Sequence, residues 1–194
     1  MRYRVWSMGL VIIFLSVASV SLGQESTLQY FLAKTSSKDL NLSAKEKTEL
    51  LQRIENAVEQ TEQVHQRLVQ MISGGELEIR YQEGQYWMSK LSEDQRALET
   101  ARKELKVLKE KPTFLVPAIK LYKSLKDLSF NLNAYNNVPS FSALVGDLAP
   151  DLELWTDPVF YELYLVPLAT SRDRDLQSKP SPKERKPPPK EKNP

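Results

Sequence analysis

The sequence predicts an all-α fold: three long heptad-patterned helices in an antiparallel hairpin or bundle, closed by one or two short C-terminal helices. Three runs along the chain place apolar residues alternately three and four positions apart, which puts them on one face of a helix. The chain has 194 residues and no cysteine, so disulfides cannot contribute and apolar packing must hold the fold. The stretch between residues 24 and 171 is long enough for one domain with a sizeable core.

The first run predicts a helix over residues 44–72. Ser43 and Glu46 have the spacing of a capping box, in which each side chain accepts a hydrogen bond from the other residue's backbone amide. Gly74 and Gly75 end the helix, since glycine readily adopts the left-handed conformation of a helix terminus. The apolar stripe, broadened on an adjoining row by Leu51, Val58 and Ile72, consists of Leu50, Ile54, Ala57, Thr61, Val64, Leu68 and Met71.

The second and third runs predict two further long helices. Pro112 ends the second helix, but its start is open, because Ser92 and Gln95 form another capping box that would leave residues 86–91 in the connection. Pro117 suits the first turn of the third helix, which ends before Pro139. The second stripe consists of Trp87, Leu91, Asp94, Leu98, Ala101, Leu105 and Leu108, and the third of Ala118, Leu121, Leu125, Leu128, Leu132 and Tyr135.

Charge favours packing of the first two helices against each other. Glutamates dominate one helix and lysines and arginines the other, and opposite charges on neighbouring faces select helix partners. The alternative is that both are solvated faces. The charged residues are Glu46, Glu49, Glu55, Glu59 and Glu62 on the first helix and Arg96, Arg102, Lys103, Lys106, Lys109 and Lys111 on the second.

Residues 75–88 connect these two helices and have a mixed pattern. Leu77, Ile79 and Tyr81 alternate with charged residues, which indicates either a short strand-like excursion or a frayed helix start. Tyr81, Tyr86 and Trp87 are candidate contacts for a partner, because aromatic side chains are large anchors in interfaces. The alternative is that they close the end of the bundle.

Short apolar pieces between residues 139 and 169 are expected to fold back over the open side of the three helices. Asp157 and Pro158 have the order of an N-cap and a first helical residue, so they predict the start of a short helix. Pro167 is expected to bend or end that helix.

Residues 1–23 have the layout of a secretory signal peptide. Two arginines precede an apolar run from Met8 to Val20, and Ser21 and Gly23 are the small residues of a cleavage site. The alternative is an uncleaved membrane anchor, since the apolar run approaches the length that spans a bilayer. No later run is comparably apolar, so we expect no membrane span after signal removal. Because the chain lacks cysteine, the expected location is the bacterial periplasm or envelope, or the medium.

Signal removal leaves a formally neutral protein with an uneven charge distribution. Loss of Arg2 and Arg4 lowers the basic residues from 27 to 25, equal to the 25 acidic residues. From Arg172 onward, eight basic residues stand against four acidic ones, so the body before the tail is slightly acidic. An acidic body argues against nucleic-acid binding.

Residues 172–194 are predicted to form a disordered tail, since they are rich in proline and charged residues and have almost no apolar side chain to bury. The tail is either a solubilising spacer or a weak contact for anionic envelope polymers. The candidate contact residues are Lys183, Arg185, Lys186, Lys190 and Lys192.

No residue is predicted to be catalytic or to bind a cofactor or metal. His65, the only histidine, lies beside the first stripe and is expected at a surface or flanking position. With no cysteine and one histidine, a zinc site has no ligand set, and the glycines lack the setting of a phosphate loop. The one remaining candidate is the acidic and aromatic segment 147–164, because carboxylates beside aromatic rings are typical of sugar-cleaving sites.

The sequence therefore predicts an exported, non-enzymatic helical interaction or scaffold protein of the bacterial cell envelope, which binds a protein partner or associates with itself. The alternative is a carbohydrate-binding or weak hydrolase module in segment 147–164. The expected organisation is a signal peptide (1–23), an N-terminal linker or short helix (24–42), a helical bundle domain (43–171) and the tail (172–194).

Signal cleavage is testable by mass spectrometry of the N-terminus after expression of the full chain in a Gram-negative bacterium. We expect the protein in the periplasmic extract to begin at Gln24, directly after the small residue Gly23. An intact N-terminus recovered from the membrane fraction would instead establish the anchor.

Overall fold

The computed structural model describes residues 28–76 and 80–177, and 87% of these residues are helical, with no strand among them. The all-helical class is therefore confirmed. Residues 1–27, which include the predicted signal peptide, and residues 178–194 lie outside the described residues. The elements are a helical segment at 28–36, then α2 (Ala44–Ser73), α3 (Tyr81–Glu110), α4 (Leu115–Asn136), α5 (Pro139–Val145), α6 (Leu148–Leu154), the π-helix η1 (Trp155–Leu165) and α7 (Val166–Gln177).

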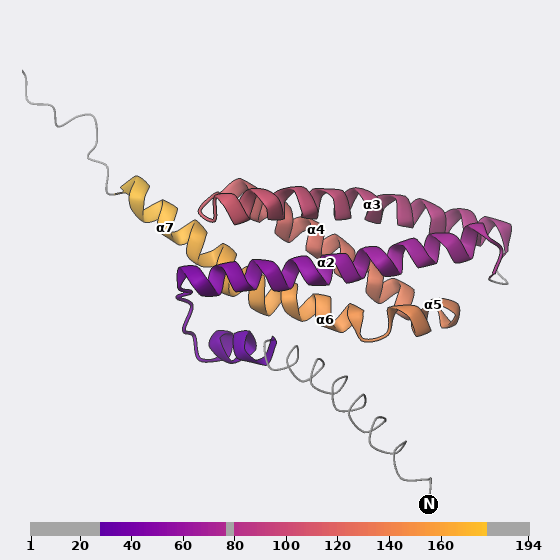
Figure 1. Ribbon diagram of the computed structural model, residues 1–194, viewed down its shortest axis with the longest axis horizontal. Coiled ribbons are helices and arrows are strands. Elements are labelled where there is room, and N and C mark those ends of the chain that lie inside the picture. The colour runs from indigo at the N-terminus through magenta and orange to yellow at the C-terminus, as the bar shows by residue number, and fades with distance from the viewer. Residues whose placement is uncertain (1–27, 77–79, 178–194) are drawn as a thin grey trace, which may run out of the picture.

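The long helices run side by side along the long axis of the molecule. α2 and α3 point in opposite directions, and α6 lies along the same axis below them in the view of Figure 1. α3 packs against both α2 and α4, while α4 also contacts α5, α6 and η1. α4 thus joins the long N-terminal helices to the C-terminal ones.

The start and end of α2 agree with the sequence prediction. The Ser43 amide donates to a Glu46 carboxylate oxygen at 2.7 Å, and the Glu46 amide donates to the Ser43 hydroxyl oxygen at 3.2 Å. After Ser73, Gly75 has a φ of 68°, the left-handed conformation that favours glycine.

Glu46 also attaches the segment 28–36 to α2. Its carboxylate accepts from the Lys34 ammonium at 2.6 Å and from the Tyr30 hydroxyl at 2.5 Å. The hydrogen bond from Lys34, followed by those from Ser43 and Tyr30, holds the pKa of Glu46 well below its usual range. The short helix anticipated before residue 43 is therefore present and tied to the start of α2.

α3 begins earlier than the second capping box predicts. Tyr81 is already helical, and the Ser92 hydroxyl donates to the carbonyl of Met88 at 3.0 Å, as a serine inside a helix does. The alternative start at Ser92 is therefore wrong, because the helix is already formed there and the Ser92 hydroxyl donates to a carbonyl within it. Residues 77–79 of the strand-like pattern lie outside the described residues.

α4 has the extent that its stripe predicts, with Pro117 in the first turn and Asn136 as the last residue. The predicted helix start at Asp157 and Pro158 is wrong, because both residues lie inside η1. A proline ring clashes with the carbonyl four residues earlier in an α-helix, and the wider winding of a π-helix separates the two groups. α6, η1 and α7 therefore continue without a break, Pro167 lies in the first turn of α7, and α7 extends to Gln177, past the expected boundary at Ser171.

The core combines most of the three predicted stripes with buried apolar residues of α5, α6 and η1. α4 buries its entire stripe, and α3 buries all of its stripe except the half-buried Trp87. On α2, Val64 and Met71 are half-buried, and His65 beside Val64 is buried. Of the charges expected to join α2 and α3, Glu62 pairs with Arg102 at 2.7 Å, and Glu55 pairs with Lys109.

Within residues 28–76 and 80–177, no helix has the length and apolar character needed to cross a lipid bilayer.

Truncation of Leu125 to alanine should lower the free energy of unfolding by about 2–5 kcal/mol, because its side chain is fully buried and the change leaves a cavity. Ile119→Ala on the same helix is the matched control. Ile119 is 49% exposed, so its truncation should cost well under about 1 kcal/mol. Urea unfolding followed by circular dichroism measures both, and equal losses would contradict the packing of α4.

Candidate functional site

A buried carboxylate links α3 to α4. Asp94, the polar interruption in the second stripe, is only 4% exposed. The Asn131 side-chain amide donates to its Oδ1 at 2.6 Å, and the Tyr135 hydroxyl donates to its Oδ2 at 2.5 Å. The two donors are four residues apart on α4 and therefore share one face.

Burial raises the pKa of Asp94 above its usual value, although the hydrogen bonds from Tyr135 and Asn131 oppose the shift. Burial also raises the pKa of the Tyr135 hydroxyl, and the neighbouring carboxylate adds to that effect. The tyrosine therefore stays protonated and donates to Asp94. The hydrogen bonds from Asn131 and Tyr135 to Asp94 are strong, whereas burial disfavours the ionised form of the Asp94 carboxyl group.

His65 is buried beside this contact, contrary to the expected surface or flanking position. It is 8% exposed and its Nε2 lies 2.8 Å from the carbonyl oxygen of Leu91, which can only accept. Nε2 therefore carries the proton, and the buried Nδ1 has no hydrogen-bond partner within the described part of the chain. The signal was present in the sequence, because His65 lies seven residues after Val58 and seven before Ile72, on the adjoining apolar row.

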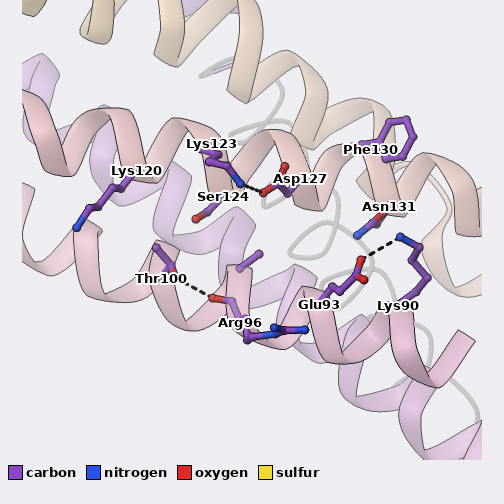
Figure 2. Close-up of a pocket in the computed structure, with 11 residues that line it drawn as sticks. Lys90, Glu93, Arg96, Thr100, Lys120, Lys123, Ser124, Asp127, Phe130 and Asn131 are labelled. Atoms are coloured by element: carbon purple, nitrogen blue, oxygen red, sulfur yellow. Dashed lines mark hydrogen bonds and ion pairs between the residues drawn. The ribbon is translucent and has the colours of Figure 1, made fainter.

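A groove of about 630 Å³ lies between the outer faces of α3 and α4, over this buried contact. Asn131 belongs to both, since it lines the groove and donates to Asp94. Figure 2 shows the two walls with their charged side chains. The lining residues are Lys90, Glu93, Arg96, Ala97 and Thr100 from α3 and Lys120, Lys123, Ser124, Asp127, Phe130 and Asn131 from α4.

Two of the lysines in the groove are paired within their own helix. Lys90 contacts Glu93 at 2.9 Å, and Lys123 contacts Asp127 at 2.9 Å, as the dashed lines in Figure 2 mark. These spacings of three and four residues are the usual ones for helical ion pairs. Each pair contains one positive and one negative charge, so neither pair contributes to the net charge of the groove.

Arg96 and Lys120 provide the remaining positive charge. The Arg96 Nε donates to the carbonyl of Ser92 at 3.3 Å, and among the described residues its guanidinium has no ion pair. The Lys120 ammonium lies 3.8 Å from the Glu104 carboxylate, which is a loose contact. The groove is therefore basic, although the body of the protein is slightly acidic.

Exposed aromatic side chains lie at one end of the groove. Phe130 on the α4 wall is 74% exposed. Tyr86 on α3 is 55% exposed and precedes Lys90 by four residues, so it extends the α3 wall by one turn. The end of α3 that carries Tyr86 faces the same part of α4, since Trp87 contacts Tyr135.

The three aromatic residues proposed as partner contacts thus have different surroundings. Tyr86 lies one helical turn beyond the groove residue Lys90 on α3. Trp87 packs against Tyr135 and Phe141, with ring centroids 5.6 and 5.4 Å apart, and closes the core at this end. Tyr81 is 79% exposed on a different face of α3, where its hydroxyl accepts from Gln85 at 2.7 Å.

The acidic and aromatic segment 147–164 distributes its side chains among separate partners. Asp157 accepts from the Tyr122 hydroxyl at 2.9 Å and from the Lys126 ammonium at 2.5 Å, so it fastens η1 to α4. Glu153 accepts from the Asn133 amide at 3.2 Å. Trp155 is 3% exposed in the core. Among the described residues, no three His, Asp or Glu side chains gather as a metal-binding group.

The proposed polyanion contacts Lys183, Arg185, Lys186, Lys190 and Lys192 lie outside the described residues.

Comparison with protein-family models, curated proteins and solved structures finds no match to this chain. The groove and the contact beneath it are therefore the observations on which a functional argument rests.

Asp94 should make the protein less stable as the pH rises. Its folded-state pKa lies above 3.8, so between about pH 3.8 and the raised pKa the unfolded chain releases this proton first, and stability falls by up to about 1.4 kcal/mol for each pH unit. Asp94→Asn removes this loss, so the variant's stability relative to the unmodified protein should increase with pH across that window.

Urea unfolding at several pH values measures the effect. Asp127→Asn is the matched control, because Asp127 is exposed on α4. A constant difference between Asp94→Asn and the unmodified protein at all pH values would show that Asp94 does not titrate abnormally.

Proposed function

We propose that this protein is an exported, non-enzymatic interaction protein of the bacterial cell envelope, and that its heptad-packed helical bundle binds a protein partner in the groove between α3 and α4. The observation that carries the proposal is a groove with basic walls and exposed aromatic side chains, Phe130 on its α4 wall and Tyr86 one helical turn beyond its α3 wall. Phe130 and Tyr86 leave 74% and 55% of their surface exposed. Large aromatic residues that cluster at a groove are typical anchors of protein interfaces.

The buried contact below the groove supports binding at this position. Asp94 holds Asn131 and Tyr135 on α4, so the two walls keep a fixed separation and register. A preformed surface loses little conformational entropy when a partner binds. The groove is therefore a rigid platform with aromatic side chains at one end.

The proposed location rests on the signal-peptide pattern of residues 1–23 and on the absence of cysteine from the chain. A contact of the basic tail with anionic envelope polymers is a secondary part of the proposal. The net positive charge of the tail would give only weak binding to such polymers, and salt would weaken that binding further. A pull-down from envelope fractions with the mature protein and with a form truncated after Ser171 tests the tail, and equal recovery of partners would remove any role for it.

Site-specific photocrosslinking tests the groove. Replacement of Phe130 by benzoylphenylalanine conserves an exposed aromatic side chain in the groove, and the same replacement at Tyr81 places the probe on another face of α3. In bacterial cells with an intact envelope, we expect one defined crosslinked protein adduct from position 130. The Tyr86→Ala substitution should reduce the yield of this adduct several-fold. An adduct from position 81 and none from position 130 would overturn the groove as the binding site.

A further inference from the structure

We infer that the partner presents an acidic amphipathic helix to the groove, with apolar side chains on Phe130 and Tyr86 and carboxylates on Arg96 and Lys120. This inference deepens the proposed function and rests on it. It follows from the charge balance, the shape and the exposed apolar surface of one site.

Charge selects the chemistry of the partner. Lys90 and Lys123 already have carboxylate neighbours at 2.9 Å. Arg96 forms no ion pair with another described residue, and its Nε contacts the Ser92 carbonyl at 3.3 Å, so its guanidinium can form a bidentate pair with an incoming carboxylate. An acidic segment would therefore gain new ion pairs, whereas a basic segment would meet uncompensated positive charge.

Shape favours a helix as the bound element. The walls are two long helices, and a groove between helices accepts the apolar face of a third through positions three and four residues apart. Ala97 in the α3 wall has a small side chain, which permits close approach of the bound helix midway along the groove.

A second copy of this chain is a poorer occupant. In a symmetric dimer the groove would face itself, so Arg96 and Lys120 would lie against the same positive charges. Insertion of the glutamate-rich α2 of another copy would be a head-to-tail contact, which continues into open chains of molecules. The structure therefore favours an acidic helix from a different protein.

Peptide binding to the mature protein tests the inference. The probe is a synthetic helical peptide with leucines alternately three and four residues apart and glutamates on the flanking positions, and the matched peptide has glutamine in place of every glutamate. By fluorescence anisotropy at low salt, we expect the glutamate peptide to bind about tenfold more tightly, with the preference declining as salt rises.

The charge variant is Arg96→Gln with Lys120→Gln, and the control is Lys103→Gln with Lys106→Gln, which removes the same charge from exposed positions of α3 outside this groove. Circular dichroism establishes that both variants fold. The first variant should abolish the preference for the glutamate peptide, and the control should retain it. Equal binding of the two peptides to the unmodified protein, or equal loss in both variants, would overturn the acidic partner.

The remaining outcomes are also decisive. Binding of unstructured polyglutamate as tight as that of the helical peptide would overturn the requirement for an amphipathic helix. A dimer in sedimentation that Arg96→Gln dissociates would assign the groove to a second copy. If a defined adduct forms at position 130 while the glutamate peptide has no advantage, the proposed function stands and this inference fails.

Discussion

The hydrogen-bonded carboxylate of Asp94 is the constraint on which the arrangement of α3 and α4 depends. Its two donors, Asn131 and Tyr135, come from one face of α4, so only one axial position of that helix satisfies it. A slip of α4 would leave a buried carboxylate without donors, at a cost of several kcal/mol. Apolar stripes alone tolerate such shifts, because one leucine can replace another in a similar contact.

The groove is a direct consequence of this register. Asn131 is shared by the buried contact and the groove, so the position of α4 that satisfies Asp94 also places Phe130 beside the α3 wall. The same position brings Lys120 toward Glu104 and leaves Arg96 without an ion pair among the described residues. The hydrogen bonds that hold Asp94 in the core thus also determine which charged side chains on the surface have no ion-pair partner nearby.

The opposite sides of α3 serve different purposes. On the side that faces α2, Arg102 pairs with Glu62 and Lys109 pairs with Glu55, so these basic side chains form ion pairs between the two helices. Toward the outer face of α4, the positive charge exceeds what neighbouring carboxylates neutralise. On the far side of α4, Asp157 accepts from Tyr122 and Lys126 and holds the π-helix in place. Ionic contacts therefore fix the neighbours of α4 on one side and leave a basic groove on the other.

The sequence by itself determined the helical class, the extent of α2 and α4 and most of the core, because helical periodicity and helix caps depend on residues close together in the chain. It also held the position of His65 on an apolar row, but the residue's polarity argued for the surface. Only the tertiary structure decided that Asp94 is buried, that Phe130 lines the groove, and that Pro158 lies within a π-helix. Each of these depends on partners more than twenty residues away or on packing against another helix, which no local pattern specifies.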